Sequence, residues 1–486
     1  MDTNRASRAV RVYQEKLVDV WWGDSRDLGF IPDESVHCAV TSPPYYGLRS
    51  YKGDGQIWSD GWEGQLGAEP DPSSYIQHLV EIFREVRRVL RRDGTFWLNI
   101  AGSYAGGNYR GGGADSASSK QLSNFGTVGF MGKRAVEVPD GFKPLDMIPI
   151  PFMLAIALQA DGWWLRSDVL WIKPNPMPIS ARGWRYERHK IRMETSERAE
   201  NSYRQGADQD LLQGAGVGPG VQREAYFEEG DGASKWADCP GCPKCSPTDG
   251  FILRKGNWRP TPSHEYVLLL AKSGNYFLDG ESVLEPSHYD GRKKTKAPLA
   301  EHGREHYSGA DGHERWPNPG GRNMRDVWTL ATDPLPSHLR GTHYAAFPRK
   351  LVENCVRAGT SEHGVCSGCG SPFVRVIQSA PSPHTGKTAT SYDKETMTAG
   401  RLALLRQAAR EQGGEYQKVT ATIGWRPSCK CPDPSPIPST VLDPFGGSGT
   451  TAFVAREMGR MAISVDCSME YSVLSIKRLV GGGGAK

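Results

Sequence analysis

The sequence predicts an α/β protein whose core is a parallel β-sheet, and two observations support this fold class. Short apolar strands alternate along the chain with segments in which apolar residues recur every three or four positions, as on the buried face of a helix. The crossovers between these strands are long enough to hold a helix, which parallel neighbours require.

The first part of the chain shows the alternation clearly. Residues 35–45, SVHCAVTSPPY, form a short apolar strand that two prolines end. Apolar residues then recur at helical spacing from 76 to 90, after the start signal Asp71-Pro72-Ser73. A buried strand is expected at 95–102, followed by a Gly- and Ser-rich segment at 105–135. A helix near 146–160 and a strand at 164–172 continue the pattern.

The alternation stops at Pro174 and returns after about residue 320. Proline clusters, the basic and aromatic run ARGWRYERHKIR (181–192) and the basic GRKKTK (291–296) lie between, so an inserted domain is expected. Regular structure returns with a strand at 326–330 and an apolar helix after Phe347. It ends with VLDPFGGSGTT, the strand MAISVD (461–466) and a last helix. Residues 362–432 form a second insertion, which contains four cysteines.

Composition excludes several classes of protein. The 486 residues contain 59 Lys and Arg against 55 Asp and Glu, a net charge of +4, which does not favour a histone-like binder. The first residues lack the apolar stretch of a signal peptide, and the longest apolar run is about half a membrane span. We therefore expect a soluble cytoplasmic protein that has no membrane partner.

Seven of the ten cysteines gather in two clusters with the spacing of metal ligands. Cys366 and Cys369, together with Cys429 and Cys431, supply four thiolates, which suits a closed structural zinc site. Cys239, Cys242 and Cys245 supply three more, and the fourth ligand would be a histidine such as His264 or another cysteine. We expect one or two structural zinc ions; the alternative is a set of free thiols.

A glycine-rich turn follows the strand that ends at Asp443. Gly446, Gly447 and Gly449 let the backbone approach a ligand, and the helix that begins near Thr450 presents N–H groups to an anionic group. The next strand ends in Asp466, where a carboxylate can accept hydrogen bonds from ribose hydroxyls. Alone, this pattern is equally typical of a tight strand–helix turn with a capping aspartate.

TSPPYYG (41–47) places polar and aromatic side chains at a second strand end. Because the prolines fix the backbone, the Ser42 hydroxyl and the Pro43 carbonyl can act as two preset acceptors for the protons of an exocyclic amine. Tyr45 or Tyr46 offers a flat face on which a base can stack. In isolation, a Pro-Pro turn after a strand is mostly structural.

Together, these motifs resemble those of the S-adenosylmethionine-dependent DNA amino-methyltransferases. TSPPY is similar to the family's catalytic tetrad with its leading Thr, and DPFGGSGTT resembles its FxGxG cofactor motif. Their order is that of the β class, so the resemblance implies a circularly permuted Rossmann-like methyltransferase fold. Residues 1–176 would form its catalytic half, and 321–361 with 433–486 its cofactor half. Residues 177–320 would be a target-recognition insertion and 362–432 a zinc-binding insertion.

The resemblance also implies the site residues. The catalytic residues would be Ser42, Pro43, Pro44 and Tyr45. The residues that bind S-adenosyl-L-methionine would be Asp24 of WWGDS, Thr41, His343, Phe347, Pro348, Asp443, Pro444, Phe445, Gly447, Gly449, Thr450 and Asp466.

The first residue of the tetrad bears on the target base. In the family, Ser at this position implies mainly N4 of cytosine, whereas Asp or Asn implies mainly N6 of adenine, which is the alternative. An uncharged Ser suits a reaction in which the amine attacks the methyl group in line and loses its proton afterwards. Methylation at C5 of cytosine would need a cysteine nucleophile, and the chain has no Pro-Cys dipeptide. A zinc-stabilised DNA-binding protein without activity is the remaining alternative.

The amino group of a paired base is reached by flipping the base out of the duplex, so double-stranded DNA is the expected partner. Contacts to phosphates would come from the two basic runs, whose alternative interpretation is a solvated face. The candidates are Arg182, Arg185, Arg188, Lys190, Lys293 and Lys294. The resemblance leaves open a cognate restriction endonuclease, and either a monomer or a homodimer.

Overall fold

The computed structural model describes residues 9–47, 55–105, 138–176, 183–192, 236–256, 258–286, 322–333, 347–379 and 420–481. The chain divides into two compact units. The larger contains Met1–Asn175 and Ser263–Lys486, and the smaller contains Pro176–Pro262. Four of the predicted site residues, Arg182, Lys293, Lys294 and His343, lie outside the described residues.

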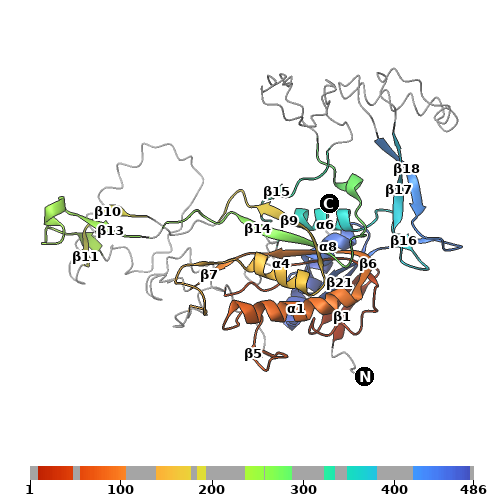
Figure 1. Ribbon diagram of the computed structural model, residues 1–486, viewed down its shortest axis with the longest axis horizontal. Helices are drawn as coiled ribbons and strands as arrows, with labels where there is room; N and C mark the ends of the chain where they lie inside the picture. Colours follow the sequence, from red (N-terminus) through yellow and green to blue (C-terminus); the bar gives the residue numbers. More distant parts are fainter. Residues whose placement is uncertain are drawn as a thin grey trace, which may run out of the picture. The chain divides into compact units, whose positions relative to one another are not determined.

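A nine-stranded mixed sheet forms the core of the larger unit (Figure 1). In spatial order its strands are β1 (Val10–Glu15), β2 (Val18–Trp22), β21 (Met461–Asp466), β20 (Thr440–Asp443), β3 (Val36–Thr41), β6 (Leu90–Ile100), β14 (His264–Ala271), β9 (Trp164–Ile172) and β15 (Val327–Thr329). The five strands from β2 to β6 in this order run parallel. β1 pairs antiparallel to β2, and β14 pairs antiparallel to both β6 and β9.

Helices cover both faces of this sheet, as the alternation of buried side chains along the strands requires. Ala39, Phe96 and Leu268 belong to the hydrophobic cluster that includes α1 (Pro72–Val89) and α4 (Ile150–Ala160). The buried apolar residues next to these three along the strands point to the opposite face of the sheet. They belong to the hydrophobic cluster that includes α6 (Arg349–Gly359), α8 (Thr450–Glu457) and α9 (Met469–Gly481). The predicted capping signal is confirmed, because the Asp71 carboxylate accepts from the amides of Ser73 and Ser74 at the start of α1.

The structure corrects the prediction of a parallel sheet at two strands, the edge strand β1 and the interior strand β14. β14 comes from the apolar run HEYVLLLA and lies antiparallel between β6 and β9, where its side chains are buried on both faces of the sheet. This strand falls in the region expected to be an insertion up to residue 320, whereas the smaller unit ends at Pro262. The chain therefore leaves the sheet after β9 and re-enters it through the adjacent strand, with Ile172 opposite His264.

Short two-stranded pairs complete the described parts of the fold. In the larger unit these pairs are β4 (Gln56–Ile57) with β5 (Glu63–Gly64), β7 (Ser103–Tyr104) with β8 (Met147–Ile148), β16 (Val365–Cys366) with β19 (Pro436–Ile437), and β17 (Phe373–Ser379) with β18 (Thr420–Pro427). In the smaller unit β10 (Arg185–Arg188) pairs with β13 (Phe251–Arg254), and β11 (Lys190–Arg192) pairs with β12 (Trp236–Asp238). Two 3-10 helices lie at Ser246–Thr248 and Gly280–Val283. Within the described ranges, no helix is both long and apolar enough to cross a membrane.

Candidate active site and cysteine clusters

A direct hydrogen bond joins the two motifs that the sequence singles out. β3 and β20 are parallel neighbours, which brings their carboxyl ends to the same edge of the sheet. The buried Thr41 hydroxyl donates to Asp443 Oδ1 over 2.5 Å, and the Phe445 amide donates to the same oxygen over 3.1 Å. The TSPPY turn and the glycine-rich turn are therefore held against each other.

The glycine-rich turn packs tightly against the elements that follow it. A Cβ atom at Gly446 would lie 2.1 Å from Ser464 Oγ, and one at Gly449 would lie 2.3 Å from Ser475 Oγ. Gly449 also has a φ of +73°, which disfavours any side chain. At these two positions glycine is needed for packing against β21 and α9, a reason beyond the predicted approach to a ligand.

Two carboxylates lie at this edge without a cationic partner among the described ion pairs. Asp466 accepts the amides of Ser468 and Gly447, each over 2.8 Å, and Asp443 is fully buried. Burial raises the pKa of each to about 6, and for Asp443 the hydrogen bond from Thr41 opposes the rise. Each oxygen of Asp466 has a second lone pair, so this side chain can still accept hydroxyl donors.

The WWGDS segment contacts the turns that follow β20 and β21. The Gly23 amide donates to the carbonyl of Asp466 over 3.0 Å, and the Ser25 hydroxyl donates to the carbonyl of Pro444 over 2.5 Å. Asp24 lies between these contacts, and its carboxylate accepts from Arg26 Nε over 2.9 Å. The Arg26 guanidinium in turn covers the Trp58 ring at 4.5 Å, so Asp24 is held by an ion pair that the motif did not reveal.

Other predicted cofactor residues lie around the helix that follows the turn. Phe445 is half-buried, and its ring meets Phe83 edge-on at 6.4 Å. The Thr450 hydroxyl accepts from the buried Arg478 over 2.8 Å. Phe347 and Pro348 precede α6, whose first residue, Arg349, lies over the Phe453 ring of α8 at 4.6 Å. These contacts gather the start of α6 and the start of α8 on one side of the sheet.

The tetrad belongs to a network of five polar side chains. Tyr45 Oη lies 3.3 Å from Ser42 Oγ and donates to Glu265 Oε2 over 2.7 Å. Asn99 Nδ2 donates to Tyr45 Oη over 2.8 Å and to Glu265 Oε2 over 2.9 Å. Lys173 Nζ forms an ion pair with the other oxygen of Glu265. Asn99 is buried, and its Oδ1 has no hydrogen-bond partner among the described residues.

The topology explains how this network assembles. Ser42, Asn99 and Lys173 lie at or just beyond the carboxyl ends of β3, β6 and β9, which share one edge. β14 runs the opposite way, so its beginning, with Glu265, lies at that same edge. Asn99, Lys173 and Glu265 are not among the residues predicted from the sequence. The available signal was a polar residue at one end of each of three apolar strands.

The structure also distinguishes the two tyrosines of TSPPYYG. Tyr46 is buried, with its ring 5.6 Å from that of Tyr75. The Tyr75 hydroxyl donates to the Pro44 carbonyl over 2.6 Å, which fixes the proline turn. Tyr45 is half-buried and joins the polar network, so it is the tyrosine that borders the candidate site.

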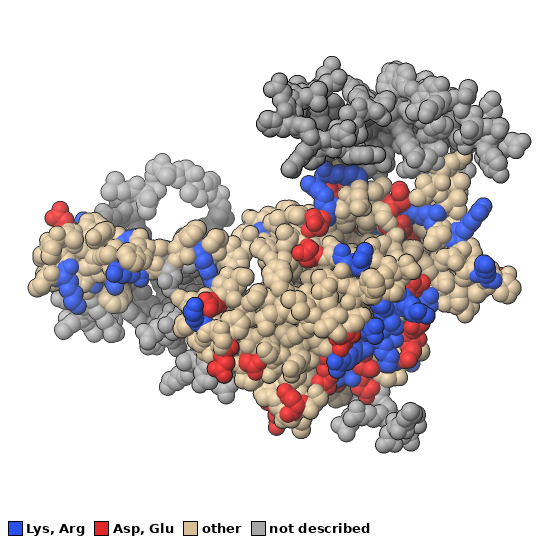
Figure 2. Space-filling model, viewed as in Figure 1, with Lys and Arg blue, Asp and Glu red and all other residues tan. Residues whose placement is uncertain are grey.

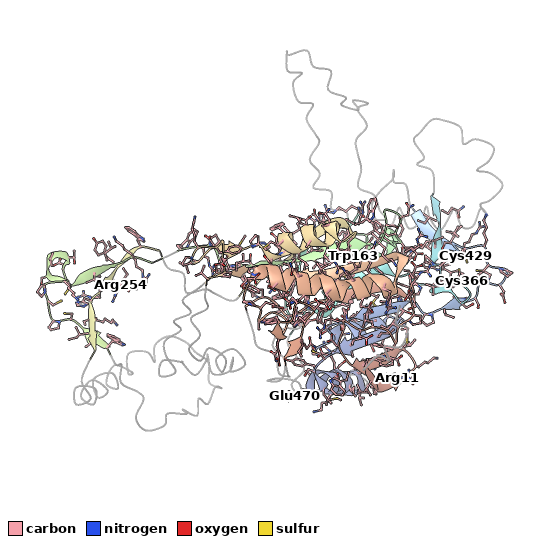
Figure 3. The ribbon with its side chains drawn as sticks, turned by 60° about the horizontal axis from the view of Figure 1, so that its bottom comes forward. Arg11, Trp163, Arg254, Cys366, Cys429 and Glu470 are labelled. Atoms are coloured by element: carbon pink, nitrogen blue, oxygen red, sulfur yellow. The ribbon has the colours of Figure 1, made fainter. Side chains whose placement is uncertain are left out.

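The later cysteine cluster is complete and is attached to the sheet. The sulfur atoms of Cys366, Cys369, Cys429 and Cys431 all lie within 4.8 Å of one another, and Figure 3 shows Cys366 and Cys429 side by side. Arg91 donates to the Cys369 carbonyl over 2.8 Å, and His37 contacts the Gly370 carbonyl at 3.0 Å. Burial lowers the pKa of His37 to about 4, so its ring is neutral at pH 7. Nδ1 accepts the Thr440 amide, which leaves Nε2 as the donor to Gly370.

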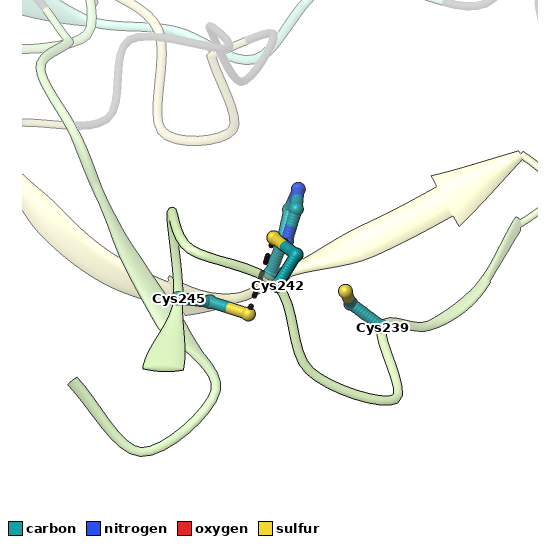
Figure 4. A group of neighbouring side chains, drawn as sticks. Cys239, Cys242 and Cys245 are labelled. Carbon is teal, nitrogen blue, oxygen red and sulfur yellow. Dashed lines mark hydrogen bonds between the residues drawn. The ribbon is translucent and has the colours of Figure 1, made fainter. Parts of the chain in front are cut away.

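The earlier cluster gains a fourth candidate ligand, and it is His189 rather than His264. The ligand atoms of Cys239, Cys242, Cys245 and His189 lie within 4.8 Å of one another. Figure 4 shows the three sulfur atoms directed toward one small space. His264 instead begins β14, where its ring lies against Tyr266.

The described candidates for DNA contact lie on the strands of the smaller unit. Arg185 and Arg188 belong to β10, and Lys190 begins β11. Most of the described surface of this unit in Figure 2 is neither basic nor acidic, and more of its charged side chains are basic than acidic. In the larger unit, by contrast, two of the three arginines of α1 are in ion pairs: Arg84 with Asp161, and Arg88 with Asp33 and Glu85.

Sequence comparison decides the family. The profile of the N6/N4 DNA methylases matches residues 36–367 and 435–477, which include both motifs and most of the chain. The chain belongs to this DNA methylase family. The resemblance inferred from TSPPY and DPFGGSGTT is thereby confirmed.

Relatives of this DNA methylase are similar along nearly the whole chain. The type II methyltransferase M.SmaI of Serratia marcescens is 27% identical over 94% of this chain and 89% of its own length. M.Cfr9I of Citrobacter freundii is 31% identical over 93% of this chain and 83% of its own. Among solved structures, the cytosine-N4-specific PvuII DNA methyltransferase aligns with 98% of this chain and 90% of its own, with 14% identity and a TM-score of 0.43.

The family match does not cover the whole chain. The two matched ranges leave out residues 368–434, which contain Cys369, Cys429 and Cys431. Three of the four residues of the later cysteine cluster therefore lie in a segment that the family profile does not contain.

Proposed function

We propose that this DNA methylase transfers a methyl group from S-adenosyl-L-methionine to the N4 amino group of cytosine in duplex DNA. The observation that carries the proposal is the hydrogen bond between Thr41 and Asp443. It links the turn expected to bind the amine with the turn expected to bind the cofactor, as transfer between two bound molecules requires. Catalytic half before cofactor half is the order of a circularly permuted methyltransferase.

The target amine would be oriented by acceptors at the end of β3. The Ser42 hydroxyl and the Pro43 carbonyl would each accept one amine proton, which leaves the nitrogen lone pair directed at the methyl group. The Asn99 amide nitrogen lies 3.4 Å from Ser42 Oγ and would help to hold this hydroxyl in place. No strong base is needed before transfer, because the amine loses its proton afterwards.

Tyr45 would support the flipped base with its ring face. Its hydroxyl is held by Asn99 and Glu265, so the ring has a fixed orientation. A fixed ring loses little conformational entropy when a base stacks on it. Pro43 and Pro44 keep the turn rigid, and Tyr75 holds Pro44 from behind.

The residues of the cofactor half fit a ligand that is positively charged and carries hydroxyl groups. Asp443 and Asp466 are carboxylates without a cationic partner in the described structure, and burial raises the pKa of each. A positive charge bound nearby would stabilise their ionised forms. Asp466 would accept ribose hydroxyls, and Phe445 would line the pocket. Asp24, His343, Phe347 and Pro348 are proposed to complete it. When bound, S-adenosylmethionine supplies the electrophilic methyl group.

Duplex DNA is the proposed substrate, and the smaller unit is proposed to recognise its sequence. The likeness to type II methyltransferases supports a role in restriction–modification with a cognate endonuclease in the cytoplasm. We propose a monomer or a homodimer as the working form.

Product analysis tests the proposal. The purified protein is incubated with labelled S-adenosylmethionine and unmethylated duplex DNA, and the nucleosides are identified by mass spectrometry. N4-methylcytosine is expected, whereas N6-methyladenine would show that the target is N6 of adenine instead. Ser42→Ala should abolish the product while cofactor and DNA binding persist. Ser35→Ala, at the other end of β3, is the matched control and should remain active.

A further inference from the structure

We propose that Cys239, Cys242, Cys245 and His189 bind one zinc ion, and that this ion orders the strand pairs β10–β13 and β11–β12, with which the smaller unit contacts duplex DNA. The first part stands on geometry alone. The second part rests on the proposed function, because it assumes that duplex DNA is the substrate.

The ligand atoms of all four side chains lie within 4.8 Å of one another, and Cys242 has the spacing of a tetrahedral zinc site to two of them. Bonds of about 2.3 Å to sulfur and 2.0 Å to nitrogen place two sulfurs about 3.8 Å apart, and a sulfur and a nitrogen about 3.5 Å apart. Cys242 Sγ lies 3.7 Å from Cys245 Sγ and 3.3 Å from His189 Nδ1. A disulfide would need sulfurs about 2.05 Å apart, so the observed distance belongs to ligands and not to a covalent bond.

The backbone around these side chains is already arranged for a metal. The Cys242 carbonyl accepts the amides of Cys245 and Ser246, which closes a tight turn between two ligands. The His189 amide donates to the Gly250 carbonyl, and the Cys239 amide donates to the His189 carbonyl. Residue 189 is therefore joined to both ends of the cysteine segment, although about fifty positions separate them in the chain.

The smaller unit also lacks an alternative source of stability. Among its described residues, Cys245 is the only buried one. Trp184, Trp236 and Trp258 are all more than half exposed. Small units without an apolar core are held together by metals or disulfides, and the cysteines here are free. A zinc ion bound by four protein ligands has no open position, which makes it structural.

The position of His189 connects the metal to DNA binding. It lies between β10 and β11, in the middle of the run ARGWRYERHKIR. Residues 183–192, 236–256 and 258–262 contain eight Lys and Arg against three Asp and Glu. Trp184 and Tyr186 are exposed beside these cations, and Lys255 lies 4.7 Å from the Trp184 ring. Exposed aromatic and basic side chains on neighbouring strands suit phosphates and bases.

Zinc ligation by His189 would fix both strands that carry these side chains. Arg185 and Arg188 lie on β10, and Lys190 lies on β11, so each is within four residues of the ligand. Without the ion, two short ladders and a few further hydrogen bonds and ion pairs would hold these strands together, and such short pairs are marginal in water. The ion would therefore govern the affinity for DNA while leaving cofactor binding unchanged.

The test measures metal content, DNA affinity and cofactor affinity on the full-length protein. Cys242→Ser and His189→Ala should each lose one equivalent of zinc relative to wild type, as measured by mass spectrometry of the metal. Their affinity for duplex DNA should fall by about an order of magnitude or more. Calorimetry should show unchanged binding of S-adenosylmethionine. His264→Ala, the matched histidine control, should keep its full metal content.

His189→Cys provides a second test of the metal site in case the other variants fold poorly. A fourth thiolate should retain the ion and most of the DNA affinity, and the absorption of the cobalt-substituted protein should shift as sulfur replaces nitrogen. Full metal content in Cys242→Ser would overturn the site. Loss of metal with unchanged DNA affinity would overturn its role in binding. If the variants lose zinc but the wild-type protein itself binds no DNA, the metal site stands and the proposed DNA substrate fails.

Discussion

The Tyr45 hydroxyl donates a hydrogen bond of 2.7 Å to Glu265, a residue 220 positions away in the chain. One residue belongs to the proline turn after β3, and the other lies near the start of the antiparallel strand β14. Asn99 and Lys173 bind the same carboxylate from β6 and from the end of β9. The orientation of the tetrad tyrosine thus depends on three other strands.

Glu265 is therefore expected to act as a positioning residue. Glu265→Ala removes the acceptor of Tyr45 and the partner of Lys173, so kcat should fall by about tenfold or more, with cofactor affinity unchanged. Tyr45→Phe removes the same hydrogen bond from its other end. Steady-state kinetics of the double variant should show a loss smaller than the product of the two single losses. Independent, multiplicative losses would show that the contact does not position the ring.

The buried charge of Asp443 is expected to limit the stability of the protein without ligand. Its pKa is raised to about 6, whereas an unfolded aspartate loses its proton near pH 4. Folded-state stability should therefore fall as the pH rises from about 4 to 6 and level off above. Asp443→Asn keeps an acceptor for Thr41 without the charge, so it should be about 1–3 kcal/mol more stable at pH 8.

Urea denaturation of both proteins at pH 4 and pH 8 checks this expectation. The advantage of Asp443→Asn should vanish at pH 4, where the wild-type carboxyl is neutral. Equal stabilities at pH 8 would mean that the carboxylate is better solvated than its surroundings indicate. Asp140→Asn, at an exposed carboxylate, provides the control for removing a charge.

Removing metal from the later cysteine cluster is expected to destabilise the larger unit and not only its insertion. Arg91 and His37 tie Cys369 and Gly370 to β6 and β3, and His37 also holds the first residue of β20. If zinc binds there, Cys369→Ser with Cys431→Ser should lower the midpoint of thermal unfolding by at least about 5 °C. Cys467→Ser, at an exposed cysteine outside both clusters, should leave the metal content unchanged.

The tight packing of the glycine-rich turn gives a prediction of rescue. Gly446→Ala would place Cβ 2.1 Å from Ser464 Oγ, and the backbone of Gly446 is not among those with positive φ. This overpacking should cost about 1–3 kcal/mol of stability. Ser464→Ala removes the clashing oxygen and leaves its own Cβ at 3.4 Å, so the double variant should recover most of the loss. A double variant as unstable as Gly446→Ala would point to backbone strain instead.

Local sequence patterns were sufficient for much of the fold and for the two motifs. The strand at 164–172 matches β9, and proline and glycine signals fixed the ends of β3 and the turn after β20. Both motifs follow strands directly, so their meeting at one edge follows from parallel pairing. These features depend on residues that are close together in the chain, so they can be predicted from the sequence.

The missed parts depend on contacts between distant segments. Glu265 could not be placed because β14 pairs with β6 and β9, strands that precede it by about a hundred residues or more. Cysteine spacing suggested a metal but could not choose between His189 and His264. That choice depends on how the strand pairs β10–β13 and β11–β12 meet, and no local sequence pattern predicts such a contact.

The smaller unit is joined to the sheet through the adjacent ends of β9 and β14, where the Lys173 amide donates to the Ser263 carbonyl over 2.7 Å. Both junctions lie on a single antiparallel ladder, so the sheet closes whatever the length or sequence of the chain between them. Under the proposed role of the smaller unit in recognition, exchanging residues 176–262 should change the DNA specificity and leave intact the edge of the sheet that carries Ser42 and Asn99. Chimaeras joined at Lys173 and Ser263 would test this expectation.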